Sequence, residues 1–314
     1  MITFLSWKNI SKNLTSTAVG WFVFACLAHL FSLRPLWWDE NAVFRSIKEL
    51  SPAQIFGPLL AAQVFPRFYL FFIQDIARVF DYHLLSLRIL PFAAMTGSFF
   101  IWLKIYKQEG LERLQHLLII FSWCASYYLI YYSAELKQYS GDVFVAAIFT
   151  LFLYKQRQFG QDKQIALCEK LSILLPILLL FSYIGYLFVW IPLYNYLLSI
   201  KNNKKNFNLV IFYSISLILF VFFSYYFDIR FYKGHMQEYF NDYFISLKSP
   251  AEFLKNFTEG TNNLLSCWFS EVRIIKKFAR FFAVFGLYAI FHFFIINFRK
   301  EKFRIYSASC LSFV

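Results

Sequence analysis

Long, uninterrupted runs of apolar residues are the feature that most constrains this chain. A helix needs about 20 consecutive apolar residues to cross the hydrocarbon core of a bilayer, where only helices and closed barrels satisfy their backbone polar groups. The runs here are continuous rather than alternating, so they predict helices and not barrel strands. Only 16% of the 314 residues are charged, against about 25% in soluble domains. We therefore predict an all-α, polytopic transmembrane protein.

The apolar runs predict about eight spans. The six runs of suitable length are Thr17–Leu33, Ser86–Tyr106, Leu117–Tyr132, Tyr139–Tyr154, Leu209–Phe227 and Phe281–Phe298. The run Leu171–Ile200 is too long for one span and has basic residues at both ends, so it is interpreted as a hairpin of two short helices turning near Ser182–Gly185. Residues Ile305–Val314 start another apolar run, from which we expect a truncated ninth span and an incomplete chain.

Basic residues give the predicted spans an orientation. The net charge of +13 is concentrated in short Lys and Arg clusters between apolar runs. That arrangement orients membrane proteins and differs from the continuous basic patch of a nucleic-acid-binding protein. With a cytoplasmic N-terminus, most clusters fall in the cytoplasm, and loops 34–85 and 228–280 and the link 133–138 lie outside. We predict a multi-pass protein of the bacterial cytoplasmic (inner) membrane, with its active site facing the periplasm or exterior.

The first outer loop is expected to carry interfacial helices. The run Phe68–Phe80 is too short to cross a membrane, and it contains Gln74, Asp75 and Arg78. A short amphipathic helix of this kind lies in the plane of the membrane surface.

Two adjacent carboxylates follow a tryptophan pair just past the first span, in Trp37-Trp38-Asp39-Glu40. Tryptophans gather at headgroup depth, which places Asp39 and Glu40 at the outer membrane–water boundary. A carboxylate there can act as a general base toward a hydroxyl, or it can hold a divalent cation that neutralises a phosphate. The structural alternative is an aromatic belt followed by the N-cap and acidic first turn of a helix over Asn41–Leu50.

A polar link joins two predicted spans on the same outer side and carries Glu135, Lys137, Tyr139 and Asp142. Charged side chains between spans are costly when they face lipid, so these are expected to face a cavity. Lys137 is a suitable point charge for a phosphate. Glu135 is expected either to pair with Lys137 or to share a metal site with Asp39. The structural alternative is a solvated turn with a local Glu–Lys pair.

Further polar residues occur where the chain enters the second span. Gln63 and Tyr69 flank the start of the predicted interfacial helix, and Arg88 lies at the outer mouth of the span. Arg88 can contact a phosphate, or it can snorkel, with its stem in the apolar layer and its guanidinium among the headgroups. Taken by itself, the residue favours snorkelling.

These motifs, in this order, resemble those of bacterial membrane glycosyltransferases of the GT-C superfamily, closest to the family 39-like or ArnT-like group with an RgtA/B/C/D-type domain. The shared elements are an Asp-Glu pair, a Q-x-x-P-x-x-Y entry to an interfacial helix, an L-R-x-x-P start of a span, and a YY-S-x-E-x-K-x-Y link. The matching residues are Asp39 and Glu40; Gln63, Pro66 and Tyr69; Leu87, Arg88 and Pro91; and Tyr131 to Tyr139. Many relatives carry Arg where Lys137 stands, so a bidentate phosphate contact is not available here.

The resemblance implies a single GT-C-like transmembrane domain over residues 1–314, incomplete at its C-terminus, that transfers a sugar from a polyprenyl-phosphate donor to a lipid, glycan or protein. It implies that Asp39 deprotonates the acceptor hydroxyl, which attacks the anomeric carbon with inversion. Glu40 and Glu135 would orient the acceptor or a divalent cation, for which Asp39 and Glu135 are the candidate ligands. Lys137 and Arg88 would stabilise the departing lipid phosphate. The residues expected to line the substrate site are Trp38, Gln63, Tyr69 and Tyr139.

Two other classes of function use the same charges. A transporter or flippase of lipid-linked sugars would use them as a pathway through the membrane. Many transporters carry internal repeats, and no such repeat is visible in this sequence. A non-catalytic membrane scaffold would tolerate alanine at Asp39 and Glu135.

The five cysteines are scattered without metal-binding spacing, so no zinc site is predicted.

Overall fold

The structure is a computed structural model that describes residues 7–108, 113–158, 177–188, 193 and 205–231. The chain divides into two compact units. The first comprises Met1–Ala125 and Leu129–Tyr232, and the second comprises Ser126–Tyr128 and Lys233–Val314. The predicted span Phe281–Phe298, most of the predicted hairpin Leu171–Ile200 and nearly all of the outer loop 228–280 lie outside the described residues. The helices and the site described below belong to the first unit, apart from Tyr127 and Tyr128 at the start of α6.

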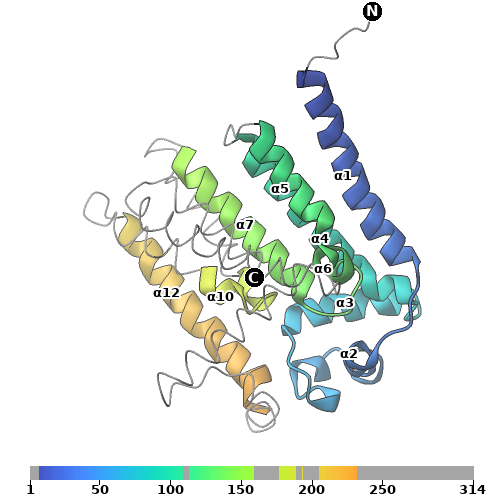
Figure 1. Ribbon diagram of the computed structural model, residues 1–314. Coiled ribbons are helices and arrows are strands. Elements are labelled where there is room, and N and C mark those ends of the chain that lie inside the picture. Colours follow the sequence, from blue (N-terminus) through green and yellow to red (C-terminus); the bar gives the residue numbers. More distant parts are fainter. Residues whose placement is uncertain (1–6, 109–112, 159–176, 189–192, 194–204, 232–314) are drawn as a thin grey trace, which may run out of the picture. The chain divides into compact units, whose positions relative to one another are not determined.

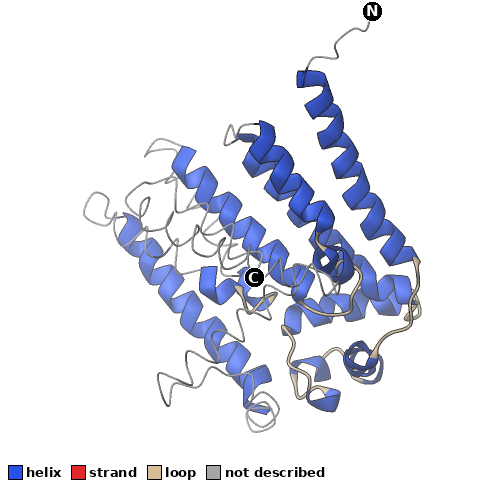
Figure 2. Ribbon diagram, in the orientation of Figure 1, coloured by secondary structure: helices blue, strands red, loops and turns tan. Residues whose placement is uncertain are grey.

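The described residues are helical and contain no β-strand (Figure 2). This confirms the all-α prediction for that part of the chain. The α-helices are α1 (Trp7–Phe31), α2 (Trp38–Glu49), α3 (Arg67–Val79), α4 (Leu84–Gln108), α5 (Arg113–Ala125), α6 (Tyr127–Tyr132), α7 (Tyr139–Gln158), α10 (Gly185–Phe188) and α12 (Lys205–Ser224). The shorter turns are η1 (Gln54–Phe56), η2 (Leu60–Ala62), η3 (Leu178–Leu180) and the π-helical turn η4 (Tyr225–Ile229).

Two helical stretches are long and apolar enough to cross a membrane. They are Leu84–Gln108, which is α4, and Val210–Asp228, which runs from α12 into η4. Shorter apolar helices cover Thr15–Phe31 and Tyr139–Phe152. The predicted span Leu117–Tyr132 is interrupted in the structure, because α5 ends at Ala125 and α6 begins at Tyr127. Hydropathy measures how long an apolar run is, and it carries no information about whether the backbone hydrogen bonds of a helix continue through it.

The predicted interfacial helix forms as α3 and packs on α2. Its buried residues include Leu70 and Ile73, which join Val43 and Ile47 of α2 in one apolar cluster. Gln74, the polar residue of this face, is also buried, and its Nε2 donates to the carbonyls of Ile47 (2.9 Å) and Leu50 (2.7 Å). These carbonyls belong to the end of α2, where intrahelical partners run out. Gln74 therefore supplies a hydrogen-bond donor to carbonyl groups at the C-terminal end of α2.

Four long helices of this unit, α1, α4, α5 and α7, run beside one another, with α2 and α3 near one end (Figure 1). The contact between α4 and α7 depends on a small residue. A Cβ atom at Gly97 of α4 would lie 3.0 Å from Cε2 of Phe144 on α7. Small residues let helices approach closely where lipid supplies no hydrophobic driving force. Gly97 therefore permits the close contact of α4 with α7, the helix that follows the polar link.

Replacing Gly97 by leucine is expected to destabilise the protein by about 1–3 kcal/mol, because the larger side chain overpacks this contact. Gly20→Leu is the matched control, since a Cβ atom at Gly20 meets no atom within 4 Å. The measurement is thermal unfolding of both variants in detergent. Equal melting temperatures for Gly97→Leu and the parent would show that the two helices are not in close contact.

Candidate functional site

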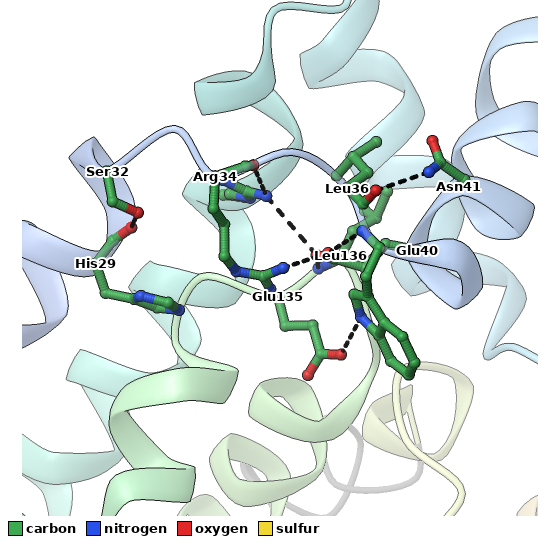
Figure 3. A network of polar contacts seen from close by, with 10 residues as sticks. His29, Ser32, Arg34, Leu36, Glu40, Asn41, Glu135 and Leu136 are labelled. Atoms are coloured by element: carbon green, nitrogen blue, oxygen red, sulfur yellow. Dashed lines mark hydrogen bonds and ion pairs between the residues drawn. The ribbon is translucent and has the colours of Figure 1, made fainter.

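The Asp39-Glu40 segment and the polar link meet in the structure. Glu40 Oε1 accepts a hydrogen bond from the backbone N–H of Leu136 at 2.8 Å. The two residues are 96 positions apart in the sequence. Figure 3 shows the contact, with Arg34 reaching the same carboxylate from the segment that follows α1. The structure thus brings the two acidic motifs to one end of the helices.

Glu40 is the centre of this junction. Its fully buried carboxylate forms an ion pair with Arg34 (2.8 Å) and lies 4.0 Å from Nη2 of the equally buried Arg88. It also accepts the backbone N–H of Trp37 at 3.2 Å. A buried carboxylate with this many partners is a structural anchor. Glu40 was predicted to orient a substrate or cation, and its burial leaves it no open surface for either.

The contact to Trp37 also changes the predicted start of a helix. The sequence indicated a helix over Asn41–Leu50, whereas α2 begins at Trp38. Trp37 occupies the N-cap position, and Glu40 reaches back to its N–H. Asp39 and Glu40 therefore lie in the first turn, where the helix dipole favours negative charge.

Arg88 does not snorkel to the membrane surface. Its side chain is fully buried, and Nη2 donates to the carbonyl oxygen of Arg34 at 2.7 Å. Arg88 thus lies beside the Glu40 carboxylate and this carbonyl oxygen, two partners that the sequence by itself did not reveal. Arg88 holds the segment between α1 and α2 in place, and it presents no exposed guanidinium to a phosphate.

Lys137 pairs with Asp39 rather than with Glu135. The Lys137 Nζ to Asp39 Oδ2 distance is 2.7 Å, and Nζ also donates to Oε1 of Gln63 at 2.9 Å. The Asp39 side chain is 27% exposed and that of Lys137 is 8% exposed. Three of the sequence motifs therefore converge on one ammonium group, and the carboxylate beside it remains open to solvent.

Glu135 lies behind this pair and is 1% exposed. Its Oε1 accepts a hydrogen bond from Nε1 of Trp37 at 2.8 Å. Its Oε2 has no hydrogen-bond partner among the described residues. Burial, reinforced by the charge of Glu40, raises the pKa of Glu135 to about 7, against the lowering effects of Trp37 and of nearby cations. Glu135 can therefore change its protonation state near neutral pH.

The predicted substrate-lining residues separate into exposed and buried ones. Trp38 is 78% exposed and Tyr139 is 40% exposed, so both present aromatic surface beside the Asp39–Lys137 pair. Tyr69 is buried under Gly141, and its hydroxyl lies 3.3 Å from Oγ of Ser140. Burial raises the pKa of this phenol above its ordinary value. Tyr69 therefore packs at the start of α7, and its role in lining the substrate stays a prediction.

Sequence reasoning did not select Trp37 or Arg34 as site residues. Trp37 links α2 to Glu135, and Arg34 neutralises Glu40 while its guanidinium lies 4.8 Å from the ring of Tyr131. The signal for both was their place beside the Asp-Glu pair.

Within the described ranges, no group of three or more His, Cys, Asp or Glu side chains is arranged to hold a metal ion. Comparison with protein-family models, curated proteins and solved structures finds no match to this chain.

Removing the Glu40 carboxylate as Glu40→Ala is expected to destabilise the protein by about 3–5 kcal/mol, because the buried Arg88 and the partly buried Arg34 lose their counter-charge. Glu49→Ala is the control: its partner Arg45 is exposed, and such pairs contribute less than about 1 kcal/mol. Thermal unfolding in detergent measures both variants. Similar melting temperatures for the two would contradict the anchoring role of Glu40.

The stability difference between Glu135→Gln and the parent is expected to depend on pH. The pKa of Glu135 in the folded chain, about 7, lies above its ordinary value of 4.5, so the folded state binds more protons between these values. The contribution of Glu135 to stability is therefore full below about pH 4.5 and is lost as the pH rises through about 7. The glutamine keeps an acceptor for Trp37 and does not ionise.

Melting temperatures at pH 5 and pH 8 test this dependence. The Gln variant should gain on the parent by several degrees between the two values. A pH-independent difference would mean that Glu135 keeps an ordinary pKa.

Proposed function

We propose that this chain is a membrane glycosyltransferase of the GT-C type, which transfers a sugar from a polyprenyl-phosphate donor to a hydroxyl of a lipid, glycan or protein acceptor. The observation that carries the proposal is the Asp39–Lys137 pair, with 2.7 Å between Oδ2 and Nζ. It joins a partly exposed carboxylate to a cation from a separate motif. Sugar transfer from a lipid phosphate needs this combination, a proton acceptor beside a cation for the leaving group.

Asp39 is the proposed general base. The acceptor hydroxyl forms a bond to the anomeric carbon, and its proton passes to the Asp39 carboxylate. The bond from that carbon to the phosphate oxygen breaks on the opposite face of the sugar, so the configuration inverts. The electron pair leaves with the polyprenyl phosphate.

Lys137 is the proposed phosphate ligand. An entering phosphate competes with Asp39 for the Nζ ammonium, and its arrival releases the carboxylate for proton transfer. The hydrogen bond from Nζ to Gln63 at 2.9 Å keeps the ammonium in place during this exchange. The lysine stabilises the negative charge that the lipid phosphate gains as the sugar departs.

The remaining groups around this pair have supporting roles. The exposed rings of Trp38 and Tyr139 are proposed to pack against the sugar or the acceptor. Arg34 and Arg88 act through Glu40, which fixes the loop of Asp39 against the link of Lys137. The relevant membrane in this proposal is the bacterial cytoplasmic membrane, with the site on its outer face.

Asp39→Asn is expected to lower the rate of sugar transfer by roughly 10²–10⁴-fold, because the general base is lost. The measurement uses the protein in lipid vesicles, a panel of polyprenyl-phosphate sugars, and mass analysis of the lipid products. Asp75→Asn is the control, since Asp75 is an exposed carboxylate on α3. Full activity of Asp39→Asn would exclude the role of base. Movement of the donor across the bilayer without transfer would favour a flippase.

A further inference from the structure

A second buried ion pair joins the end of α12 to the start of α3. Asp228 Oδ1 lies 2.6 Å from Nη2 of Arg67, and the exposed fractions of the two side chains are 0% and 1%. Asp228 Oδ2 accepts the backbone N–H of Phe65 at 3.0 Å and the hydroxyl of Tyr183. Arg67 Nε also donates to the carbonyl of Phe227 at 3.2 Å. Asp228 thus joins its own turn to two other parts of the chain, the stretch Phe65–Arg67 and Tyr183.

Stability alone does not account for such a group. Removing two charges from water is costly, and well-packed apolar residues at such positions are often as stable as the ion pair. A buried pair with directional partners does fix the relative positions of its segments. Asp228 also lies in the π-helical turn η4, and π-helical turns inside helices are frequent at functional sites.

The segment that Asp228 holds leads directly to the site. Phe65 is two residues beyond Gln63, and Gln63 Oε1 accepts the hydrogen bond from Lys137 Nζ at 2.9 Å. Pro66 lies between Phe65 and Arg67 and limits the backbone freedom of this short stretch. One end of the stretch is therefore bound to Asp228, and the other end is bound to the ammonium group of the site.

We propose that Asp228 is a positioning residue that holds Lys137 in place through the segment Gln63–Arg67. The assignment of Lys137 to the donor phosphate rests on the proposed function, whereas the mechanical link does not. Without the Asp228 carboxylate, Phe65 N–H loses its acceptor and Nη2 of Arg67 loses its counter-charge, and the segment releases Gln63 from Lys137. The ammonium then keeps only the Asp39 contact and becomes more accessible. Donor binding weakens, while the base remains intact.

The first test measures how fast Lys137 is acetylated by a membrane-impermeant N-hydroxysuccinimide ester, in the full chain in lipid vesicles, with mass spectrometry of the peptide. Asp228→Asn is expected to raise the rate several-fold. Gln63→Leu is expected to raise it by a similar factor, and the double variant should be no faster than either, because both changes break one link. Asp75→Asn, on the exposed face of α3, should leave the rate unchanged.

The second test measures transfer kinetics in the same variants. Asp228→Asn is expected to raise KM for the polyprenyl-phosphate sugar about tenfold, the size of one charged hydrogen bond, with kcat within about twofold of the parent. If no variant and no parent transfers sugar but the labelling pattern holds, the proposed function fails and the positioning role stands. An unchanged labelling rate in Asp228→Asn overturns the positioning role, as do independent multiplicative effects of the two changes.

Tyr183→Phe covers the case in which Asp228→Asn does not fold. It removes only the hydroxyl that donates to Asp228 and leaves Phe65 N–H and Arg67 in place. A smaller increase in Lys137 labelling that disappears in the Gln63→Leu background supports the link. If Tyr183→Phe folds and its Lys137 is labelled at the parent rate, while Asp228→Asn cannot be expressed, the positioning role is overturned. Asp228 would then only stabilise the fold.

Discussion

The candidate site depends on one buried carboxylate, that of Glu40. It accepts the backbone N–H of Leu136 and pairs with Arg34, so it joins the loop after α1 to the link before α7. Both segments lie between helices, after α1 ends at Phe31 and after α6 ends at Tyr132. Because Asp39 and Lys137 are the sequence neighbours of Glu40 and Leu136, this contact brings the Asp39 carboxylate near the Lys137 ammonium, with 2.7 Å between Oδ2 and Nζ. The geometry of the pair therefore follows from a residue that is itself closed to solvent.

Asp228 repeats the same arrangement at the start of α3. In both places a carboxylate accepts one arginine and one backbone N–H from a distant segment: Arg34 and Leu136 for Glu40, and Arg67 and Phe65 for Asp228. A carboxylate suits this role because it accepts several hydrogen bonds at once and its charge strengthens each of them. The two carboxylates hold the irregular segments of this end of the molecule against the helices, where apolar packing by itself has little directional preference.

Part of the site could be predicted because residue type and spacing carry chemical information. The motifs with Asp39, Gln63 and Lys137 were selected from the sequence, and the structure brings all three together. The roles of individual charged residues were less predictable. Arg88 was expected to contact a phosphate or to snorkel, and it is buried against Arg34. Glu135 was expected to pair with Lys137 or to share a metal site with Asp39. In the structure its Oε1 accepts a hydrogen bond from Nε1 of Trp37. Each outcome depends on a partner from a remote segment, which spacing along the chain does not reveal.

Local properties of the chain determined the helices. Apolar run length and amphipathic pattern are enough to specify α3 and the membrane-length helix Leu84–Gln108, because a helix closes its hydrogen bonds within its own segment. The tertiary structure decided which charges became anchors and which remained open. A buried carboxylate is stable only where its partners converge. The backbone N–H that Glu40 accepts from Leu136 lies 96 residues away, and the one that Asp228 accepts from Phe65 lies 163 residues away, so only the folded chain selects these partners.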